Sequence, residues 1–169
     1  AEQVIISNEH ITAEISAIGA EIKSIKKNEE EIMWQGDPSV WTGRAPLLFP
    51  ICGGLRDDKF TFDGKEYILE KHGFARHREF ETEKITDNSV TFLLKSDAET
   101  LKQYPFMFEL RVTYTITDGT VEVRYDVTDT DSKTMYFSIG AHEAYACPNG
   151  IEEYSVIFDK PETLNARVL

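Results

Sequence analysis

Hydrophobic and polar residues alternate in short segments along most of the chain, and turn-forming residues separate these segments. Such alternation is typical of strands that bury one face, and many of the residues are β-branched or aromatic, which suits a pleated surface. Pairs of segments flank turns at Asp63-Gly64, Asp87-Asn88 and Asp118-Gly119. An Asp-Gly pair supplies the positive φ angles that a tight hairpin turn requires. The pattern therefore predicts an all-β protein whose three hairpins form one meander.

The strands that we expect follow this alternation from one end of the chain to the other. They lie at 4–7, 11–15, 21–25, 59–62, 65–69, 80–85, 90–95, 110–116, 121–127 and 154–158. One short helix is predicted at 97–103, because Ser96 and Glu99 have the spacing of a capping box and Pro105 ends the segment. A helix of this length does not organise a fold, so the prediction is an antiparallel β-sandwich.

Length and composition describe one globular domain. The chain has 169 residues, of which 41% are hydrophobic and 28% charged, enough for a single core over residues 1–169. Its net charge of -12 repels phosphate backbones and anionic lipids, so we expect neither a nucleic-acid nor a membrane partner. Because no segment resembles a signal peptide or a membrane span, we expect a cytoplasmic protein. Cys52 and Cys147 lack CxxC spacing and are expected to be reduced, partly buried thiols.

Two stretches, 42–58 and 71–78, break the alternation and concentrate Gly, Pro, Arg and His. Loops on a rigid β scaffold are common places for function. His72 in the second stretch precedes a glycine, and His142 follows the sequence Gly140-Ala141 at a strand end. Histidine exchanges its proton near neutral pH, so both are candidate catalytic groups, although each is equally explained as a core histidine bonded to a carbonyl. We expect the other two histidines, His10 and His77, to be exposed.

The irregular stretches also hold the candidate substrate-binding residues Arg44, Arg56 and Arg76. The planar fork of arginine binds pairs of hydroxyl, carboxylate or phosphate oxygens, but each arginine can equally anchor a loop through carbonyl groups. Trp34 and Trp41 flank a turn near Gly36. An exposed indole is a usual platform for a sugar ring, and packing beneath the loop is the alternative for either tryptophan.

Motifs for other chemistries are missing from the sequence. There is no GxSxG, no GxxxxGK[ST] and no HExxH, which removes the motif-based cases for an α/β-hydrolase, a P-loop enzyme and a zincin. A metal-dependent jelly roll stays arguable, although the spacing does not match the compact His-x-His pair that such folds commonly use. Its donors would come from His72, His77, His142 and either Glu79 or Glu81.

Four motifs occur in a specific order along the chain: RAPLLFP at 44–50, FDGKEY at 62–67, HGFAR at 72–76 and SIGAH at 138–142. With about seventy residues between the two histidines, this set resembles the aldose 1-epimerase, or galactose mutarotase-like, family, and in particular its LacX-type branch. The resemblance spans residues 4–158. It covers the N-terminal part of the family domain, so the chain is expected to lack the C-terminal part.

This resemblance implies an antiparallel β-supersandwich that binds a free hexose in an open cleft and interconverts its α and β anomers without cofactor or metal. His142 matches the histidine that donates a proton to the ring oxygen, and His72 matches the one that hydrogen-bonds the substrate. The family's glutamate base belongs to the C-terminal part, and no residue here matches it. Arg76 resembles an arginine that hexose-6-phosphate mutarotases use on phosphate, while Gly54 replaces an arginine common in the branch, leaving that contact to Arg56.

The sequence thus predicts a mutarotase-like sandwich with His142 as general acid, His72 as a hydrogen-bond donor, and Arg44, Arg56 and Arg76 as binding residues. Three alternatives stay open: a carbohydrate-binding protein without activity, a hexose-6-phosphate mutarotase, and a metal-dependent enzyme of the cupin type. The expected partner is a small sugar. A homodimer formed through an open sheet edge also stays open.

Overall fold

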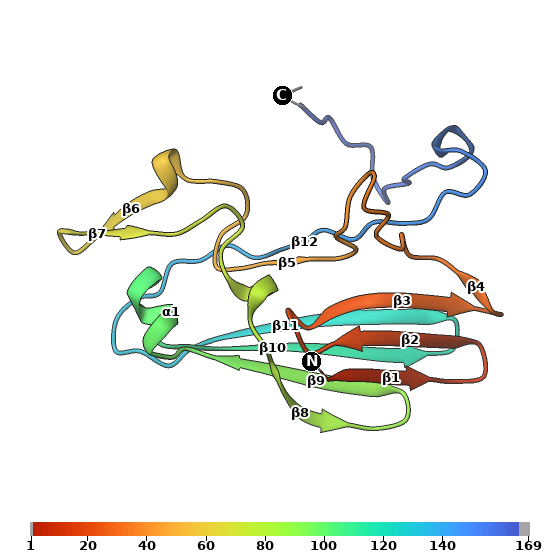
Figure 1. The fold of residues 1–169 in the computed structure, drawn as a ribbon, viewed down its shortest axis with the longest axis horizontal. Helices are drawn as coiled ribbons and strands as arrows, with labels where there is room; N and C mark the ends of the chain where they lie inside the picture. The colour runs from red at the N-terminus through yellow and green to blue at the C-terminus, as the bar shows by residue number, and fades with distance from the viewer. Residues whose placement is uncertain (1, 166–169) are drawn as a thin grey trace.

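The protein is described by a computed structural model, which covers residues 2–165 and consists mainly of antiparallel strands (Figure 1). Two four-stranded sheets, with strand orders β1-β2-β3-β4 and β11-β10-β9-β8, pack against each other around one core. Two smaller two-stranded sheets, β5 with β12 and β6 with β7, lie beyond one edge of this sandwich. The predicted antiparallel β-sandwich is confirmed.

The first sheet contains β1 (Gln3–Ser7), β2 (Ile11–Ser16), β3 (Glu21–Lys27) and β4 (Glu30–Glu31). The second contains β8 (Glu81–Ile85), β9 (Ser89–Lys95), β10 (Phe108–Thr117) and β11 (Thr120–Asp129). The small sheets are formed by β5 (Leu47–Leu48), β6 (Lys59–Phe62), β7 (Lys65–Ile68) and β12 (Gly140–Ala141). The helices are α1 (Ala98–Gln103) and the 3-10 turns η1 (Arg56–Asp58), η2 (Ala75–His77) and η3 (Ile151–Glu153). Within residues 2–165, none of these helices is long and apolar enough to cross a membrane.

All three predicted hairpins are present, but they do not form one meander. The β10–β11 hairpin closes at Thr117 opposite Thr120, with Asp118 at a φ of 51°, as the Asp-Gly turn predicts. The strands β8 to β11 are a meander, whereas β6 and β7 form a separate sheet. The chain leaves β7 through His72 and Gly73, whose φ angles of 67° and 68° turn it into η2 before β8 begins.

The predicted strand at 154–158 is wrong. This segment follows η3 as irregular chain, and within the described residues no neighbouring strand pairs with it. Val156 and Ile157 are 81% and 88% exposed. A strand needs a hydrogen-bonded neighbour as well as a suitable pattern, and the pattern alone does not supply one.

The helix α1 begins one residue later than the predicted capping box places it. Asp97 is the N-cap, and its carboxylate accepts hydrogen bonds from the backbone N–H groups of Glu99 and Thr100. The Thr100 hydroxyl in turn accepts one from the backbone N–H of Asp97. Ser96 is engaged elsewhere, since its hydroxyl accepts from the N–H of Phe108 at 3.2 Å. The box is therefore Asp97 with Thr100, not Ser96 with Glu99.

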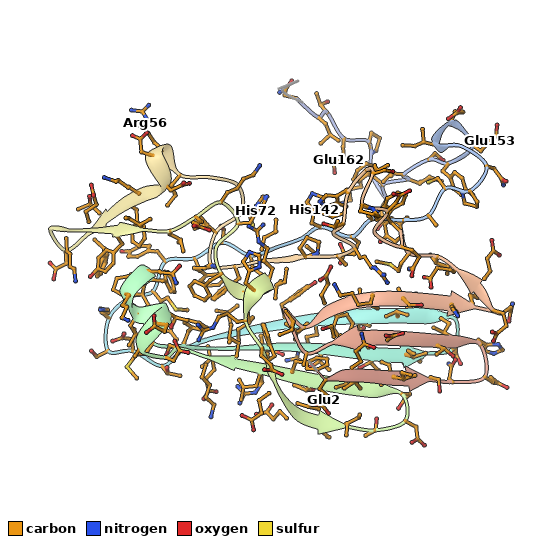
Figure 2. All side chains as sticks on the ribbon, viewed as in Figure 1. Glu2, Arg56, His72, His142, Glu153 and Glu162 are labelled. Carbon is orange, nitrogen blue, oxygen red and sulfur yellow. The ribbon has the colours of Figure 1, made fainter. Side chains whose placement is uncertain are left out.

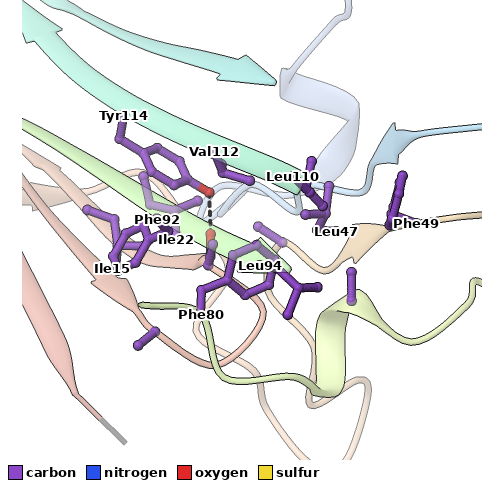
Figure 3. Packing of buried hydrophobic residues seen from close by; sticks show 14 of the residues in the cluster. Ile15, Ile22, Leu47, Phe49, Phe80, Phe92, Leu94, Leu110, Val112 and Tyr114 are labelled. Carbon is purple, nitrogen blue, oxygen red and sulfur yellow. Dashed lines mark hydrogen bonds between the residues drawn. The ribbon is translucent and has the colours of Figure 1, made fainter. Parts of the chain in front are cut away.

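The core lies between the two large sheets and extends toward the small ones (Figure 3). Along β10 every second residue is buried, as the alternation predicts. Tyr114 places its hydroxyl inside this core, where it donates a hydrogen bond to the carbonyl of Ala20 at 2.7 Å. At the other end of the core, the buried ring of Phe49 lies 5.1 Å from that of Phe108 and 6.3 Å from that of Phe74. Phe49 therefore fixes the segment that follows β5 against the sandwich.

Candidate functional site

The two histidines singled out in the sequence meet beside one short segment, residues 47–49. Strand β12 pairs with β5, with Gly140 opposite Leu48, and this ladder brings His142 to the segment. A parallel bridge between Phe49 and Gly73 brings His72 to it from the other side. Figure 2 shows both histidines on the same side of the sandwich, beyond the layers of the two large sheets. Residues seventy positions apart in sequence are thus neighbours in the structure.

Gly73 makes the close approach at this bridge. Its φ is +68°, and a Cβ at this position would lie 2.3 Å from the carbonyl oxygen of Phe49. That same oxygen accepts hydrogen bonds from the backbone N–H groups of Phe74 and Ala75 at 3.1 and 3.2 Å. Only glycine combines this conformation with this contact. The glycine after His72 is therefore what seats the histidine against the core segment.

The side chain of His72 is held by the loop residue Gly53. The N–H of Gly53 donates to Nδ1 of the histidine at 3.0 Å, and the N–H of His72 donates to the carbonyl of Gly53 at 2.8 Å. Because Nδ1 accepts, the proton of the neutral ring lies on Nε2. Burial lowers the pKa of His72, and the charges of Arg76, Lys71 and His142 lower it further. The ring is thus a neutral donor through Nε2.

His142 is the exposed member of the pair. Its ring lies 5.1 Å from that of Trp41, with the two planes tilted by 47°. Such aromatic pairs contribute about 0.5–1.5 kcal/mol beyond the area that they bury. Gly140, two residues before His142, admits a close neighbour, since a Cβ at this position would lie 2.8 Å from Sγ of Cys52. Cys52 is an exposed free thiol, so the prediction that it is partly buried is wrong.

The histidines share a hollow of about 480 Å³ that we call the histidine pocket. Its lining consists of Trp41, Pro46, Leu48, Lys71, His72, Arg76 and His142. Arg76 is held in place by two hydrogen bonds, from Nε to Nε2 of His77 at 2.9 Å and from Nη2 to the carbonyl of Lys71 at 3.0 Å. Three of the five predicted site residues, His72, His142 and Arg76, therefore come together in this pocket.

Arg44 and Arg56 lie apart from the histidine pocket. The Nη1 group of Arg44 donates to the carbonyl of Lys23 and to Oε1 of Gln35, both at 3.0 Å, which is the loop-anchoring role left open in the sequence. Arg56 is exposed in η1, and Figure 2 shows it distant from both histidines. Of the other histidines, His10 and His77 are exposed, as expected.

Lys71 lines the pocket but is missing from the residues selected by sequence reasoning. The available signal was its position directly before His72, inside one of the two irregular stretches. Trp41, which lines the pocket, and Trp34 have different environments: the indole N–H of Trp34 donates to the carbonyl of Trp41 at 2.8 Å. The two tryptophans, equivalent in the sequence, are therefore distinguished by the structure.

The donors considered for a metal do not gather. Among residues 2–165, no three His, Cys, Asp or Glu side chains form a group that could hold a metal ion. His77 instead faces Arg76, and His72 faces Gly53 through Nδ1. The histidine pocket is therefore lined by two imidazoles and two cationic side chains, Lys71 and Arg76.

Comparison with known proteins agrees with the motifs. The sequence model of the family described as aldose 1-epimerase matches residues 2–166. The chain belongs to the aldose 1-epimerase family. Two LacX proteins of Lactococcus lactis subsp. lactis, plasmid and chromosomal, are each 40% identical to it over 169 aligned positions. The predicted family and its LacX branch are confirmed.

Solved structures of this family share the fold. A galactose mutarotase related enzyme from Lactobacillus acidophilus is 44% identical with a TM-score of 0.86, over 88% of this chain and 50% of that one. A galactose mutarotase-like protein from Lactobacillus casei is 40% identical with a TM-score of 0.83, over 85% of this chain and 50% of that one. The LacX alignments cover 94% of this chain and 56% of each relative. The chain thus spans about half the length of the aldose 1-epimerase relatives that it matches.

Proposed function

We propose that the protein is an aldose 1-epimerase that interconverts the α and β anomers of an aldohexose, with the sugar bound in the histidine pocket. The observation that carries this proposal is the convergence of His72 and His142 on residues 47–49, with His72 held as a neutral donor by Gly53. Membership of the aldose 1-epimerase family supports it. The sugar is the expected small-molecule partner, and a cytoplasmic location belongs to the same proposal.

The proposed reaction moves protons and opens one bond. His142 donates its proton to the ring oxygen while a base removes the proton of the C1 hydroxyl, and the bond between C1 and the ring oxygen breaks to give the aldehyde. Rotation about the bond between C1 and C2 and closure in the reverse sense return the proton to His142 and give the other anomer. A general acid of this kind contributes typically 10²–10⁴-fold in rate. No acid of this chain is assigned as the base.

His72 supports this step without exchanging its own proton. Its Nε2–H is the group free to donate to a substrate oxygen, since Nδ1 accepts from Gly53. Lys71 and Arg76 add two cationic groups to the pocket lining, which suits the oxygen-rich surface of a sugar. The reaction needs no net oxidation or reduction, so the proposal includes no cofactor.

Polarimetry of freshly dissolved α-galactose and α-glucose tests this proposal against the buffer rate. The wild-type protein is expected to shorten the approach to anomeric equilibrium, and His142→Ala is expected to remove the excess by about 10²-fold or more. His10→Ala, a substitution of an exposed histidine in the turn between β1 and β2, is the matched control. A catalysed rate that survives in His142→Ala would contradict the assignment of the acid.

A second candidate is a hexose-6-phosphate mutarotase, because Lys71 and Arg76 place two cations on one pocket. Kinetics with glucose and with glucose 6-phosphate under the same conditions distinguish a free-sugar from a sugar-phosphate mutarotase. A much lower KM for the phosphate ester, lost in Arg76→Ala, would establish the second candidate. Sugar binding without any rate excess would establish a carbohydrate-binding role instead.

A further inference from the structure

We propose that Trp41 is the substrate-stacking residue of the histidine pocket and at the same time the residue that positions His142. This inference rests on the proposed function for the identity of the ligand, a hexopyranose, and goes beyond it in naming the surface on which the sugar ring lies. Four observations carry it: the place of the indole, its support, its connection to the histidine segment, and the contrast with Trp34.

The indole of Trp41 forms one wall of the pocket. It lines the same hollow as both histidines, remains 36% exposed, and lies 5.1 Å from the ring of His142. An aromatic face that is open to a pocket and next to a proton donor presents an apolar surface to the C–H groups of a pyranose. The polar groups for its hydroxyls come from Lys71, His72 and Arg76 on the same pocket.

The indole of Trp41 packs against Gly43, which leaves room for it because it has no side chain. A Cβ on Gly43 would lie 2.3 Å from Cζ2 of Trp41 and 2.6 Å from Cε2, so the ring lies directly on the backbone of Gly43. The backbone of Trp41 is also fixed, since its N–H donates to the carbonyl of Asp37 at 2.8 Å. The platform is therefore organised before any ligand arrives, which lowers the entropic cost of binding.

The loop that carries Trp41 is bonded to the segment that carries His142. The N–H of Trp34 donates to the carbonyl of Ala144 at 3.0 Å, and the N–H of Ala144 donates to the carbonyl of Arg44 at 2.8 Å. Both ends of the loop are thus bonded to Ala144, two residues after the histidine. This connection holds the neighbouring rings of Trp41 and His142 in one unit.

Trp34 does not share this role. Its indole N–H is used on the carbonyl of Trp41 at 2.8 Å, and its own backbone holds Ala144. Trp34 thus anchors the loop through these hydrogen bonds, whereas Trp41 lines the pocket. Because the chain has only these two tryptophans, their signals can be separated in solution.

The test follows both indoles in the full chain labelled with 5-fluorotryptophan, by fluorine NMR during titration with galactose and with glucose. Trp41→Phe assigns the two resonances. We expect the Trp41 resonance to shift saturably with sugar and the Trp34 resonance to stay in place. Calorimetry is expected to show at least tenfold weaker sugar binding in Trp41→Ala, with partial retention in Trp41→Phe.

Gly43→Ala provides a variant that displaces the indole and leaves its chemistry intact, and Gly119→Ala, where an added Cβ meets nothing within 4 Å, is its matched control. We expect Gly43→Ala to raise KM and lower kcat together, because both stacking and the position of His142 change, while Gly119→Ala changes neither. Circular dichroism checks that each variant is folded.

Two results would overturn the inference. Sugar that binds by calorimetry without moving the Trp41 resonance, and with unchanged affinity in Trp41→Phe, would place the ligand elsewhere while leaving the proposed activity standing. Absence of any sugar binding would overturn the inference and the proposed function together. Sugar binding at Trp41 with no rate excess would support the inference and contradict only the proposed catalysis.

Discussion

The backbone N–H of Gly53 donates a hydrogen bond to Nδ1 of His72 across 3.0 Å. This bond exists only while Nδ1 is unprotonated, since a protonated imidazole has donors on both nitrogens. The loop thus selects one tautomer and disfavours the cation. The charges of Arg76 and Lys71 act in the same direction, after burial, on the pKa of His72.

Lys71→Gln is predicted to raise the pKa of His72, because it removes one of the charges that oppose protonation. NMR titration of the His72 ring proton measures it. In the wild-type protein the midpoint should lie below the ordinary value of 6.5. The control is Lys84→Gln, which removes the same charge from an exposed site in β8. An identical midpoint in wild type and Lys71→Gln would show that the charge of Lys71 does not lower the pKa of His72.

The same shift links pH to stability. Because the pKa of His72 is lowered in the folded protein, the unfolded chain binds this proton more readily. Protonation therefore favours the unfolded chain, and its destabilising effect is absent above pH 6.5. The free energy of unfolding should therefore decrease as pH falls from 6.5 toward the folded pKa. Denaturant titrations of wild type and His72→Gln over this range should show a smaller decrease in the variant.

Alanine variants of Arg44, Arg56 and Arg76 are predicted to differ in stability and in KM. Arg44→Ala should lower the free energy of unfolding by about 1–2 kcal/mol, because it removes two side-chain hydrogen bonds to Lys23 and Gln35. Arg76→Ala should raise KM about tenfold and cost less stability than Arg44→Ala, because both of its hydrogen bonds, to His77 and Lys71, are exposed to solvent. The exposed Arg56→Ala should change neither quantity. Urea titration and steady-state polarimetry give the two measurements. A large rise in KM for Arg56→Ala would return that residue to the site.

Gly73→Ala is predicted to destabilise the fold by about 2 kcal/mol or more, from positive-φ strain together with overpacking against Phe49. Gly64→Ala is the matched control: its φ is +75°, but an added Cβ meets nothing within 4 Å. It should lose only about 1 kcal/mol, the cost of the left-handed conformation. Equal losses in thermal or chemical unfolding would show that the contact at Phe49 contributes nothing.

Asp97→Ala is predicted to lower the free energy of unfolding by about 0.5–2 kcal/mol through loss of the cap on α1. Asp97→Asn keeps a capping oxygen but removes the charge beside Arg78, so it should retain most of the stability. Chemical denaturation of the two variants separates the cap from the ion pair. Similar losses in both would assign the effect to Arg78.

The regular part of the fold was predictable because its strands bury alternate residues and its turns contain Asp-Gly. The register of β10 against β11 follows directly from Asp118 and Gly119. The segment 154–158 has the same alternation without a partner, and pairing is a property of the whole chain that a local pattern does not contain. The N-cap of α1 lies one residue after the predicted Ser96, because the hydroxyl of Ser96 accepts a hydrogen bond from the distant N–H of Phe108.

The place of His72 beside the core segment was predictable because backbone geometry requires a glycine next to it. Gly73 marks His72 because the contact with Phe49 excludes a side chain. No neighbouring residue in the sequence distinguishes the arginines in this way, since a guanidinium binds a carbonyl or a ligand equally well. Only the positions of Lys23 and Gln35 in the fold show that Arg44 anchors a loop. Lys71 was missed for the same reason.

The hydroxyl of Tyr114 bonds the carbonyl of Ala20, in the turn between β2 and β3. The same turn receives the second irregular stretch, because the N–H of Gly19 donates to the carbonyl of Arg78 and the backbone of Arg76 packs on Gly19. One turn of the first sheet is thus fixed both to the core strand β10 of the second sheet and to the segment that carries Arg76. The place of Arg76 in the histidine pocket therefore depends on the packing of the two large sheets, so a substitution in this turn would disturb the pocket and the sandwich together.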